Sequence, residues 1–404
     1  MDKFHILTLN NIAQVGLKHL PAVKYEVGAK VKNPDAILVR SQDMHKMEIA
    51  PRVKAIARAG AGTNNIPTKQ MSERGVPVFN APGANANAVK ELVIAGMLIA
   101  ARNLLPATRF ADGLAGDDEE LNKRAEAGKE QFAGIELPQH TLGVIGLGKV
   151  GSLVADAAIK LGMHVMGYDP HITVDAAWSL PSQVKKANSV EDVLKAAEFV
   201  TLHVPLVDAT RSLISHERIK LLKHGAILLN FSRDGIVDND AVLEGLATKR
   251  IKYYVCDFPA QKLAGQAGVI ALPHLGASTR EAEDNCAIMV VDQLRDYLEH
   301  GNLQNAVNFP DVVMSRESPF RLGIANSNVP NMLGQISTAM AQAGLNIHNM
   351  VNKSRGDMAY TLVDVDSPVS DAVLDHLRAI GGVLAVRYLP DPDRELPAGG
   401  LAGG

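Results

Sequence analysis

Short apolar runs rich in valine and isoleucine alternate along this chain with longer stretches whose apolar residues recur at helical spacing. This alternation predicts parallel sheets covered by helices on both faces, because parallel strands are joined by crossover helices. In the N-terminal part we expect strands at 4–9, 35–40, 54–60 and 76–83. Six more strands, the number in a complete dinucleotide-binding fold, are expected at 141–146, 164–169, 199–205, 226–233, 253–258 and 269–274.

Two breaks interrupt this pattern. The polar, charged segment 112–138 predicts a surface helix and loop, to which we assign no chemistry. After 308–319 the order changes to strand, helix, strand, strand, helix, strand, which is typical of a small ferredoxin-like domain. The glycine-rich C-terminal segment predicts a disordered tail.

The composition narrows the class of protein. The chain has 404 residues, 47% of them hydrophobic, and a formal net charge of −3. This length allows two or three cores. The charge balance, without blocks of one sign, indicates neither nucleic-acid binding nor a membrane surface, so we expect small-molecule partners. The longest apolar run, 92–101, is shorter than the roughly 20 residues that span a bilayer, and we interpret it as a buried helix.

The cysteines and the N-terminal segment bear on the compartment. Cys256 and Cys286 are too few for a disulfide framework, and the first residues lack the apolar core of a signal peptide. We therefore expect a cytoplasmic protein. No metal is expected.

The clearest motif lies in the segment GVIGLGKVGSLVADAAIKLGMHVMGYDP, where Gly146, Gly148 and Gly151 separate an expected strand from an expected helix. The first glycine turns the chain, the second lets a pyrophosphate approach the backbone, and the third lets helix and strand pack closely. Asp169 ends the next strand, where a carboxylate binds ribose hydroxyls and repels a 2'-phosphate. The motif predicts NAD as cofactor. The alternative is a turn that serves packing alone.

Arg233, Asp257 and His274 end three later strands of the same region. Open parallel sheets bind ligands at the carboxyl ends of their strands. The guanidinium of Arg233 can hold a carboxylate in two places and polarise a carbonyl, and His274 can transfer a proton. Each residue alone could be an ordinary loop arginine or a packed histidine. Their common position at strand ends favours catalysis.

Five segments in order resemble the motifs of the D-isomer-specific 2-hydroxyacid dehydrogenases: LGVIGLGKVG, YDP, HVPLVDATRSLI, LLNFSRDGIVD and LPHLGAST. The segments KAIARAGAGTNNIP and VPVFNAPGANANAVKEL resemble the branch of that family that acts on 3-phosphoglycerate. The match covers residues 35–310. The later segment FRLGIANSNVPNMLGQISTAMAQAGLNIHNMVN resembles an ACT regulatory domain, a ferredoxin-like module that binds amino acids.

The resemblance implies an α/β fold, with a Rossmann-type nucleotide-binding domain inserted in a flavodoxin-like substrate domain, plus a C-terminal ferredoxin-like (ACT) domain. It implies NAD-dependent oxidation of 3-phosphoglycerate to 3-phosphohydroxypyruvate, the first step of serine biosynthesis, by a homodimer or homotetramer. We expect a discontinuous substrate domain at 1–88 and 280–312, the nucleotide-binding domain at 89–279, the ACT domain at 318–392 and a disordered tail at 393–404.

The family's roles transfer to matching positions. Arg233 matches the substrate-binding arginine, His274 the acid/base histidine, and Asp257 an aspartate near the nicotinamide ring. The expected substrate contacts are Arg58, Ala59, Gly60, Ala61, Gly62, Asn80, Arg233 and His274, where the backbone amides of the loop form an anion nest unless the turn serves packing alone. The expected cofactor contacts are Gly146, Gly148, Lys149, Val150, Gly151, Asp169, His203, Val204, Pro205, Thr210, Phe231, Ser232, Arg233, Asp257, His274 and Gly276.

Lys262 departs from the family pattern, which usually places a glutamate five residues after the aspartate to orient the histidine. A cation at this position would favour the neutral imidazole, which suits proton removal. If Lys262 is desolvated, burial lowers its pKa and it becomes a candidate catalytic base. Alternatively, Lys262 points to water and His274 acts alone or with a carboxylate such as Glu281 or Glu283.

In the C-terminal segment, Asn326, Asn328 and Asn346 match effector contacts of ACT domains, and L-serine is the effector that the resemblance implies. Side-chain amides suit the two charged groups of an amino acid. Asn331 stands where the family often has a glycine that leaves the ligand room. The alternative is an assembly domain whose asparagines cap a turn and a helix.

Two other functions remain open. The first is a glyoxylate or hydroxypyruvate reductase, an enzyme that shares all the nucleotide motifs. A non-catalytic protein that senses NADH is the second, and the presence of Arg233 and His274 argues against it.

Overall fold

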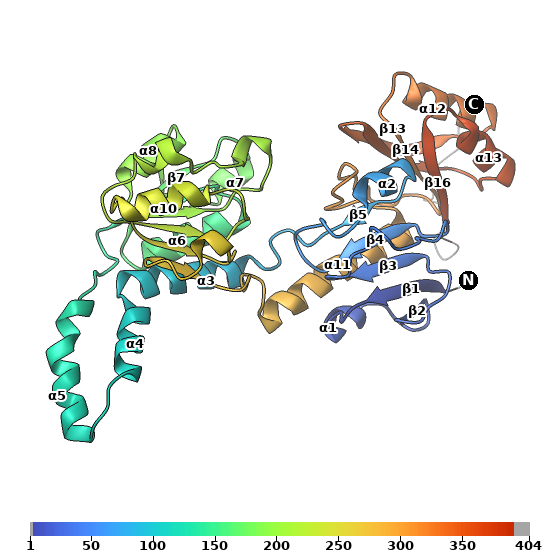
Figure 1. Ribbon diagram of the computed structural model, residues 1–404. Coiled ribbons are helices and arrows are strands. Elements are labelled where there is room, and N and C mark those ends of the chain that lie inside the picture. Colours follow the sequence, from blue (N-terminus) through green and yellow to red (C-terminus); the bar gives the residue numbers. More distant parts are fainter. Residues whose placement is uncertain (1–2, 392–404) are drawn as a thin grey trace. The chain divides into compact units, whose positions relative to one another are not determined.

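The computed structural model describes residues 3–391, except for the side chain of Asp175 (Figure 1). The tail expected at 393–404 lies outside the described residues. The chain divides into two compact units. The inserted unit contains residues 85–282, and the split unit joins the residues up to 84 with those from 283 onward.

A parallel seven-stranded sheet forms the centre of the inserted unit. Its strands are β6 (Thr141–Ile145), β7 (His164–Tyr168), β8 (Lys185–Lys186), β9 (Phe199–Leu202), β10 (Ala226–Asn230), β11 (Ile251–Cys256) and β12 (Val269–Ala271). The prediction of six strands is wrong by one. The additional strand, β8, consists of two exposed lysines and has no apolar pattern to indicate it.

The strand order is β12-β11-β10-β9-β6-β7-β8, so the chain reverses direction across the sheet between β6 and β9, as in dinucleotide-binding folds. In the strands other than β8, alternate residues face two separate cores, one shared with α3 and α6 and one shared with α8, α9 and α10. The helices of the unit are α3 (Ala86–Ala101), α4 (Leu104–Asp112), α5 (Asp118–Gly128), α6 (Lys149–Lys160), α7 (Val174–Trp178), α8 (Val190–Ala196), α9 (His216–Ile219) and α10 (Asn239–Ala247).

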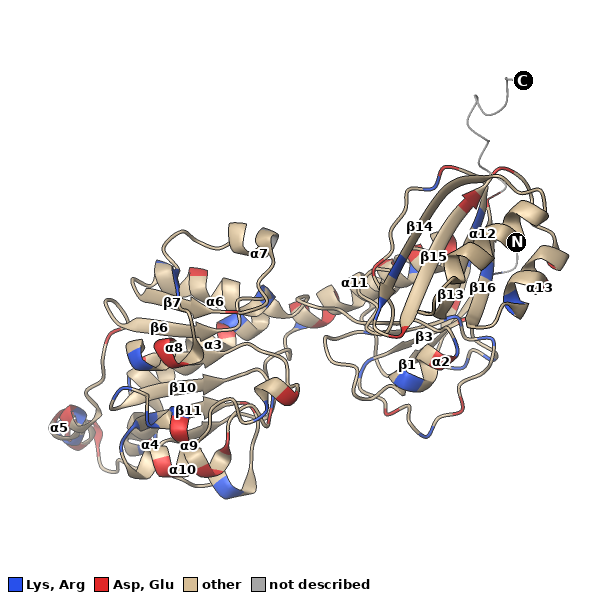
Figure 2. Ribbon diagram, turned by 90° about the horizontal axis from the view of Figure 1, so that it is seen from above, with Lys and Arg blue, Asp and Glu red and all other residues tan. Residues whose placement is uncertain are grey.

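Two helical predictions can be compared with this unit. The run 92–101 lies in α3, which buries one face only, since Leu98 is 40% exposed. The segment 112–138 contains α5, which has no buried residue and carries both signs of charge (Figure 2). The Asp117 side chain accepts a hydrogen bond from the Glu120 N–H and caps this helix. In residues 3–391, no helix combines the length and apolarity needed to cross a membrane.

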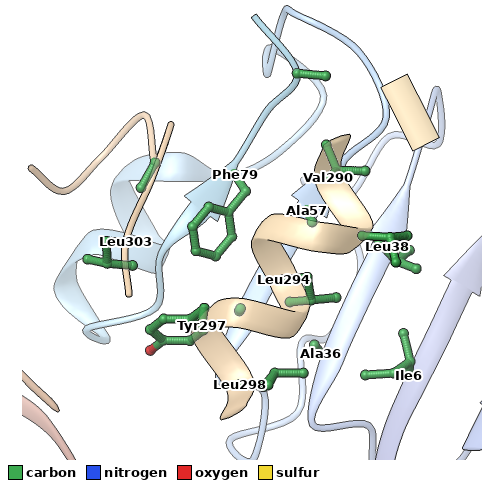
Figure 3. Packing of buried hydrophobic residues seen from close by; sticks show 14 of the residues in the cluster. Ile6, Ala36, Leu38, Ala57, Phe79, Val290, Leu294, Tyr297, Leu298 and Leu303 are labelled. Atoms are coloured by element: carbon green, nitrogen blue, oxygen red, sulfur yellow. The ribbon is translucent and has the colours of Figure 1, made fainter. Parts of the chain in front are cut away.

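A five-stranded parallel sheet forms the N-terminal part of the split unit, in the flavodoxin-like order β2-β1-β3-β4-β5. Figure 3 shows Val290, Leu294 and Leu298 of the long helix α11 (Arg280–His300) packed against this sheet. The remaining elements are β1 (Phe4–Leu9), α1 (Gln14–Leu17), β2 (Tyr25–Gly28), β3 (Ala36–Val39), β4 (Ala55–Arg58), α2 (Thr68–Glu73) and β5 (Val78–Phe79).

The C-terminal part of the split unit has the predicted ferredoxin-like order: β13 (Phe320–Ser327), α12 (Met332–Gln342), β14 (Ile347–Arg355), β15 (Met358–Val365), α13 (Asp371–Ala379) and β16 (Val383–Pro390). The antiparallel sheet packs one face against α12 and α13. Ala325, Tyr360 and Leu362, on its other face, join the core that contains α11. The predicted regulatory domain therefore has its own sheet but shares a core with the N-terminal sheet.

Arg321 and Asp364 form a fully buried ion pair at this junction. The Arg321 Nε and Nη2 donate to the two carboxylate oxygens at 2.6 and 2.9 Å. The remaining N–H groups donate to the carbonyl oxygens of His300, Met314 and Ser315 at 3.0–3.1 Å. All five guanidinium N–H groups therefore have acceptors, which is the condition for a buried arginine to be tolerated.

Other side chains of the C-terminal sheet satisfy carbonyls at the end of α11. Arg387 donates to the carbonyl oxygens of Tyr297 and Leu298, both at 2.9 Å, and its guanidinium lies 4.3 Å from the centre of the Tyr297 ring. The Tyr360 hydroxyl donates to the Gly301 carbonyl at 2.9 Å. The last carbonyls of a helix lack intrahelical partners and carry partial negative charge. The C-terminal domain thus caps α11.

We predict that Arg321→Met lowers the free energy of unfolding by about 3–5 kcal/mol, because it leaves the Asp364 carboxylate buried without its partner. Chemical denaturation measures the change. The matched control is Arg378→Met, which removes an exposed pair with Asp375 and should change stability little. Equal effects of the two substitutions would contradict the role of the buried pair.

Candidate active site

The carboxyl ends of the parallel strands gather the predicted residues of the inserted unit at one edge of the sheet. Neighbouring parallel strands lie about 4.8 Å apart, so residues that follow adjacent strands are brought close together. In strand order, His274 follows β12, Asp257 follows β11, Arg233 follows β10, His203 follows β9, Gly146 follows β6 and Asp169 follows β7.

The glycine turn after β6 is constrained at two of its three positions. Gly146 has φ +92°, and a Cβ there would lie 2.5 Å from the His203 carbonyl oxygen. A Cβ on Gly151 would lie 1.9 Å from the Gly146 carbonyl oxygen, so only glycine permits this approach of α6 to the turn. A Cβ on Gly148 would meet no atom within 4 Å. The space at Gly148 is therefore open to a ligand.

Asp169 holds the same turn from the end of β7. Its Oδ2 accepts a hydrogen bond from the Leu147 N–H and its Oδ1 one from the His171 N–H, both at 2.9 Å. The carboxylate belongs to a pocket of about 440 Å³, which has room for an adenosine group. The pocket is lined by Leu147, Gly167, Tyr168, Asp169, Pro170, Ile172, Ala177, Leu180, Val184, Lys186, Ala187 and Asn188.

The loop after β9 is tied to its neighbours by hydroxyl groups. Ser232 Oγ donates to the Val204 carbonyl and joins the ends of β10 and β9, and Thr210 Oγ1 donates to the Pro205 carbonyl. The His203 Nε2 lies 2.9 Å from Thr201 Oγ1. Burial lowers the pKa of His203 to about 3, so its ring is neutral at pH 7. His203 therefore presents an uncharged imidazole ring to a ligand.

Arg233 is exposed at the end of the turn that follows β10, where its Nη1 donates to the Ser232 carbonyl at 2.7 Å. Asn230, which the sequence analysis does not single out, shapes this turn. Its buried amide donates to the Arg233 carbonyl at 3.0 Å and accepts from the Ser232 N–H at 3.2 Å. A polar residue at the end of the apolar run AILLN is the signal that could have identified it.

His274 and Asp257 occupy neighbouring strand ends. The His274 N–H donates to the Asp257 carbonyl at 3.0 Å, and the histidine has φ +50°, an uncommon conformation for a residue with a side chain. Its ring makes an edge contact with Phe258, with ring centres 5.1 Å apart. The Asp257 side chain is 1% exposed, and its Oδ2 accepts a hydrogen bond from the Gly276 N–H at 3.1 Å. This arrangement fixes the backbone under both side chains.

Of the two environments that the sequence leaves open for Lys262, the structure shows the exposed one. Its Nζ lies 2.8 Å from both carboxylate oxygens of Asp240, and its side chain is 63% exposed. The hydrogen bond and charge of Asp240 raise the pKa of Lys262, whereas a catalytic base needs a lowered one. Lys262 thus agrees with the alternative in which it points to water, and it lacks the desolvation that a lowered pKa would need. The local sequence pattern could not indicate its partner Asp240, which lies 22 residues away.

In the split unit, the loop 58–62 is held by neighbours on three sides. The Arg58 Nε donates to the Arg40 carbonyl at 3.0 Å, the Ala59 N–H donates to the Val39 carbonyl at 2.8 Å, and the Asn80 Nδ2 donates to the Ala61 carbonyl at 2.6 Å. Within residues 3–391, the N–H groups of Ala61 and Gly62 donate no hydrogen bond. Two backbone donors are therefore available to an anion.

The three asparagines of the C-terminal domain differ in their surroundings. Asn326 is 1% exposed, and while its Nδ2 donates to the Ser327 carbonyl, its Oδ1 has no partner among residues 3–391. Asn328 is exposed and donates to the Gly356 carbonyl. Asn346 is exposed, and its N–H donates to Asp366. Asn331 has φ +63°, a conformation that asparagine tolerates better than most residues, so it replaces glycine without strong strain.

Comparison with known proteins identifies the family. Residues 97–276 match the family described as D-isomer specific 2-hydroxyacid dehydrogenase, NAD binding domain. A D-3-phosphoglycerate dehydrogenase of Haemophilus influenzae is 31% identical over 355 residues, which cover 85% of this chain and 83% of that protein. The chain belongs to the D-isomer-specific 2-hydroxyacid dehydrogenases.

Further relatives agree with this assignment. A D-3-phosphoglycerate dehydrogenase of Methanocaldococcus jannaschii is 35% identical over 359 residues, and the chain spans 65% of the length of that relative. The crystal structure of NAD⁺-bound 3-phosphoglycerate dehydrogenase of Entamoeba histolytica has a TM-score of 0.58 at 25% identity, covering 76% of this chain and 99% of that one.

NAD, the cofactor predicted from the glycine motif, is confirmed by the match to the family's nucleotide-binding domain. The residues of this 2-hydroxyacid dehydrogenase fit the cofactor. Gly148 leaves room for a pyrophosphate, and the first N–H groups of α6 point out of the helix without intrahelical partners. Asp169 lies at the pocket that suits adenosine.

We predict that Gly148→Ala folds normally but weakens NAD binding at least tenfold, because the added methyl group meets only the space that the pyrophosphate needs. Calorimetric titration with NAD measures the affinity and thermal unfolding the stability. Gly151→Ala should instead lower stability, because its Cβ collides with the Gly146 carbonyl. Unchanged NAD affinity in Gly148→Ala would contradict this assignment of the turn.

Proposed function

We propose that this protein oxidises 3-phosphoglycerate to 3-phosphohydroxypyruvate with NAD, the first step of serine biosynthesis. The observation that carries the proposal is the placement of Arg233, Asp257 and His274 after three adjacent strands of the nucleotide-binding sheet. The names of the Haemophilus and Methanocaldococcus relatives support this substrate.

Each residue of the proposed site has a chemical task. NAD, when bound, accepts the hydride from C2 of the substrate. The Arg233 guanidinium binds the substrate carboxylate and polarises the oxygen on C2. His274 removes the proton of the C2 hydroxyl, so that the carbonyl forms as the hydride leaves.

The phosphate of the substrate needs cationic or N–H donors. We assign this role to the loop 58–62, where the N–H groups of Ala61 and Gly62 have no acceptor among residues 3–391. The assignment favours a phosphorylated 2-hydroxy acid over glycolate or D-glycerate, which carry no second anionic group.

We predict NADH formation with 3-phosphoglycerate and NAD at a kcat/KM at least tenfold above that with D-glycerate or glycolate. The absorbance of NADH measures the rate. Lys262→Ala is the control variant: because the Lys262 ammonium is exposed and paired with Asp240, its removal should change kcat/KM little. Preference for unphosphorylated substrates would favour a glyoxylate or hydroxypyruvate reductase. NAD binding without turnover would favour a sensor protein.

We further propose that the C-terminal domain is an ACT domain that binds L-serine as a feedback inhibitor. The support is the buried Asn326, whose Oδ1 lacks a donor within residues 3–391 and could accept one from an amino group. Serine binding in a homodimer or homotetramer follows the family's pattern.

The two cysteines are buried free thiols, which agrees with a cytoplasmic location.

We predict that L-serine lowers the activity and that Asn326→Leu abolishes serine binding while leaving uninhibited turnover unchanged. Calorimetry measures the binding. A point substitution is preferable to truncation, because Tyr360 and Leu362 of this domain are part of the core around α11. Asn87→Ala, on the exposed face of α3, serves as control. Absence of serine binding to the unmodified protein would refute the feedback proposal alone.

A further inference from the structure

We propose that a cavity beside helix α11 binds a linear aliphatic polyamine, a chain molecule that carries two or more ammonium groups. The cavity has a volume of about 920 Å³ and is formed within the split unit, by α11 together with residues 83–84 and 304–305. Among the described residues, none of those assigned to NAD, to the substrate or to serine lines it. The inference therefore goes beyond the proposed function.

Buried polar atoms without partners draw attention to this cavity. Within residues 3–391, five buried side-chain oxygen or nitrogen atoms lack a hydrogen-bond partner. Three of them belong to Asn65, Asp257 and Asn326, which lie in or beside the sites assigned above. The other two, Gln293 Oε1 and His300 Nδ1, belong to residues that line the cavity. A buried polar group without a partner is costly, so we expect the partner in a bound molecule.

Gln293 and His300 require a ligand that donates hydrogen bonds. Gln293 is only 8% exposed, and its Oε1 can accept from an N–H group. His300 follows seven residues later, two turns along the same side of α11. Its Nδ1 can accept as well when the ring proton is on Nε2. Both requirements are met by the N–H groups of an amine.

The ionised side chains of the lining indicate the charge of this ligand. Asp292, Asp296 and Glu299 line the cavity together with one cation, Arg295, whose Nη1 is occupied by a backbone carbonyl at 3.2 Å. Three carboxylates and one guanidinium give the lining a formal charge of −2 while His300 is neutral. The charge of the cavity therefore favours a cationic ligand.

Two of the three carboxylates already have basic partners. The Asp292 Oδ1 lies 2.7 Å from His19 Nδ1, and the Glu299 Oε2 accepts a hydrogen bond from Lys24 Nζ at 3.0 Å. The Asp296 carboxylate accepts only from a neutral side-chain amide, at 3.0 and 3.2 Å, and has no cationic partner among the described residues. Asp296 is thus the carboxylate whose charge is left for a ligand to balance.

The spacing of these groups along α11 favours a chain molecule. Because an α-helix rises about 1.5 Å per residue, Gln293 and Asp296 are about 4.5 Å apart along the axis, and Asp296 and His300 about 6 Å. The nitrogen atoms of spermidine are separated by three- and four-carbon spacers, which span about 5 and 6 Å when extended with bonds of about 1.5 Å. A metal ion fits less well, since residues 3–391 contain no group of three or more His, Cys, Asp or Glu side chains able to hold one.

Calorimetric titration of the full chain with spermidine tests the proposal. We expect one spermidine to bind per chain with a dissociation constant below about 1 mM. Its affinity should fall as the salt concentration rises, because salt screens the exposed charges. The control ligand is 1,8-octanediol, a neutral chain of the same length, which should not bind measurably. Absence of saturable spermidine binding, or equal binding of the diol, overturns the proposal.

Asp296→Asn tests the position of the ligand. This substitution removes the unbalanced charge but keeps an oxygen for the neighbouring amide, so spermidine binding should weaken at least fivefold. The matched control is Asp375→Asn, which removes an exposed carboxylate of α13 in the same unit and should leave the affinity unchanged. Equal effects of the two substitutions would indicate unspecific attraction to acidic surface and overturn the assignment of the cavity.

Gln293→Leu distinguishes a ligand-binding amide from a structural one. Leucine is of similar size and has no polar atoms, so the substitution removes the unpartnered oxygen without breaking a hydrogen bond. We expect an unchanged or higher Tm together with spermidine binding that is at least fivefold weaker. Unchanged spermidine affinity in this variant overturns the inference. Because neither NAD nor substrate is present, the result does not depend on the proposed reaction.

Discussion

The common direction of the strands in the inserted unit is the constraint on which the site depends. Every pairing in the seven-stranded sheet is parallel, so all carboxyl ends meet at one edge. The sheet can keep this arrangement only because both faces are covered by helices, which bury the strands on both sides. Residues from Gly146 to His274, far apart in sequence, therefore become neighbours at one edge.

The split unit depends on the long helix α11. Its apolar face covers the N-terminal sheet. Its last carbonyls accept hydrogen bonds from Arg387 and Arg321, and Tyr360 binds the carbonyl of Gly301, which follows the helix. The boundary between the two units falls within this helix, between Ala282 and Glu283. Helix α11, which begins six residues after His274, is thus the helix whose C-terminal end is capped by the C-terminal domain.

The sequence predicted the strands and motifs that local pattern determines. Apolar runs placed β6, β10 and β11, and the glycine motif placed the turn before α6. It did not predict β2 or β8, which are too short for a clear pattern. Nor could it find the Lys262–Asp240 pair, because long-range pairing depends on how α10 packs beside the loop.

The sequence analysis did not single out the polar residues that interrupt apolar runs. Asn230 at the end of β10 and Arg321 inside β13 are both buried, and each organises the carbonyls around it. Arg321 binds Asp364 and His300, which are distant in sequence, whereas Asn230 binds the turn that directly follows it. The sequence therefore shows two unusual polar residues but not the contacts that explain them. The same holds for Asp257, whose buried oxygen becomes apparent only once the Gly276 N–H is seen to occupy the other one.

The central claim is that the residues at this edge of the sheet catalyse the transfer of a hydride from C2 of a phosphorylated 2-hydroxy acid to NAD. The most direct measurement follows that atom, using 3-phosphoglycerate that carries deuterium at C2. The account predicts deuterated NADH by mass spectrometry, together with a slower reaction than that of the unlabelled substrate when the chemical step limits the rate. NADH without deuterium, or no NADH at all from this substrate, would contradict it.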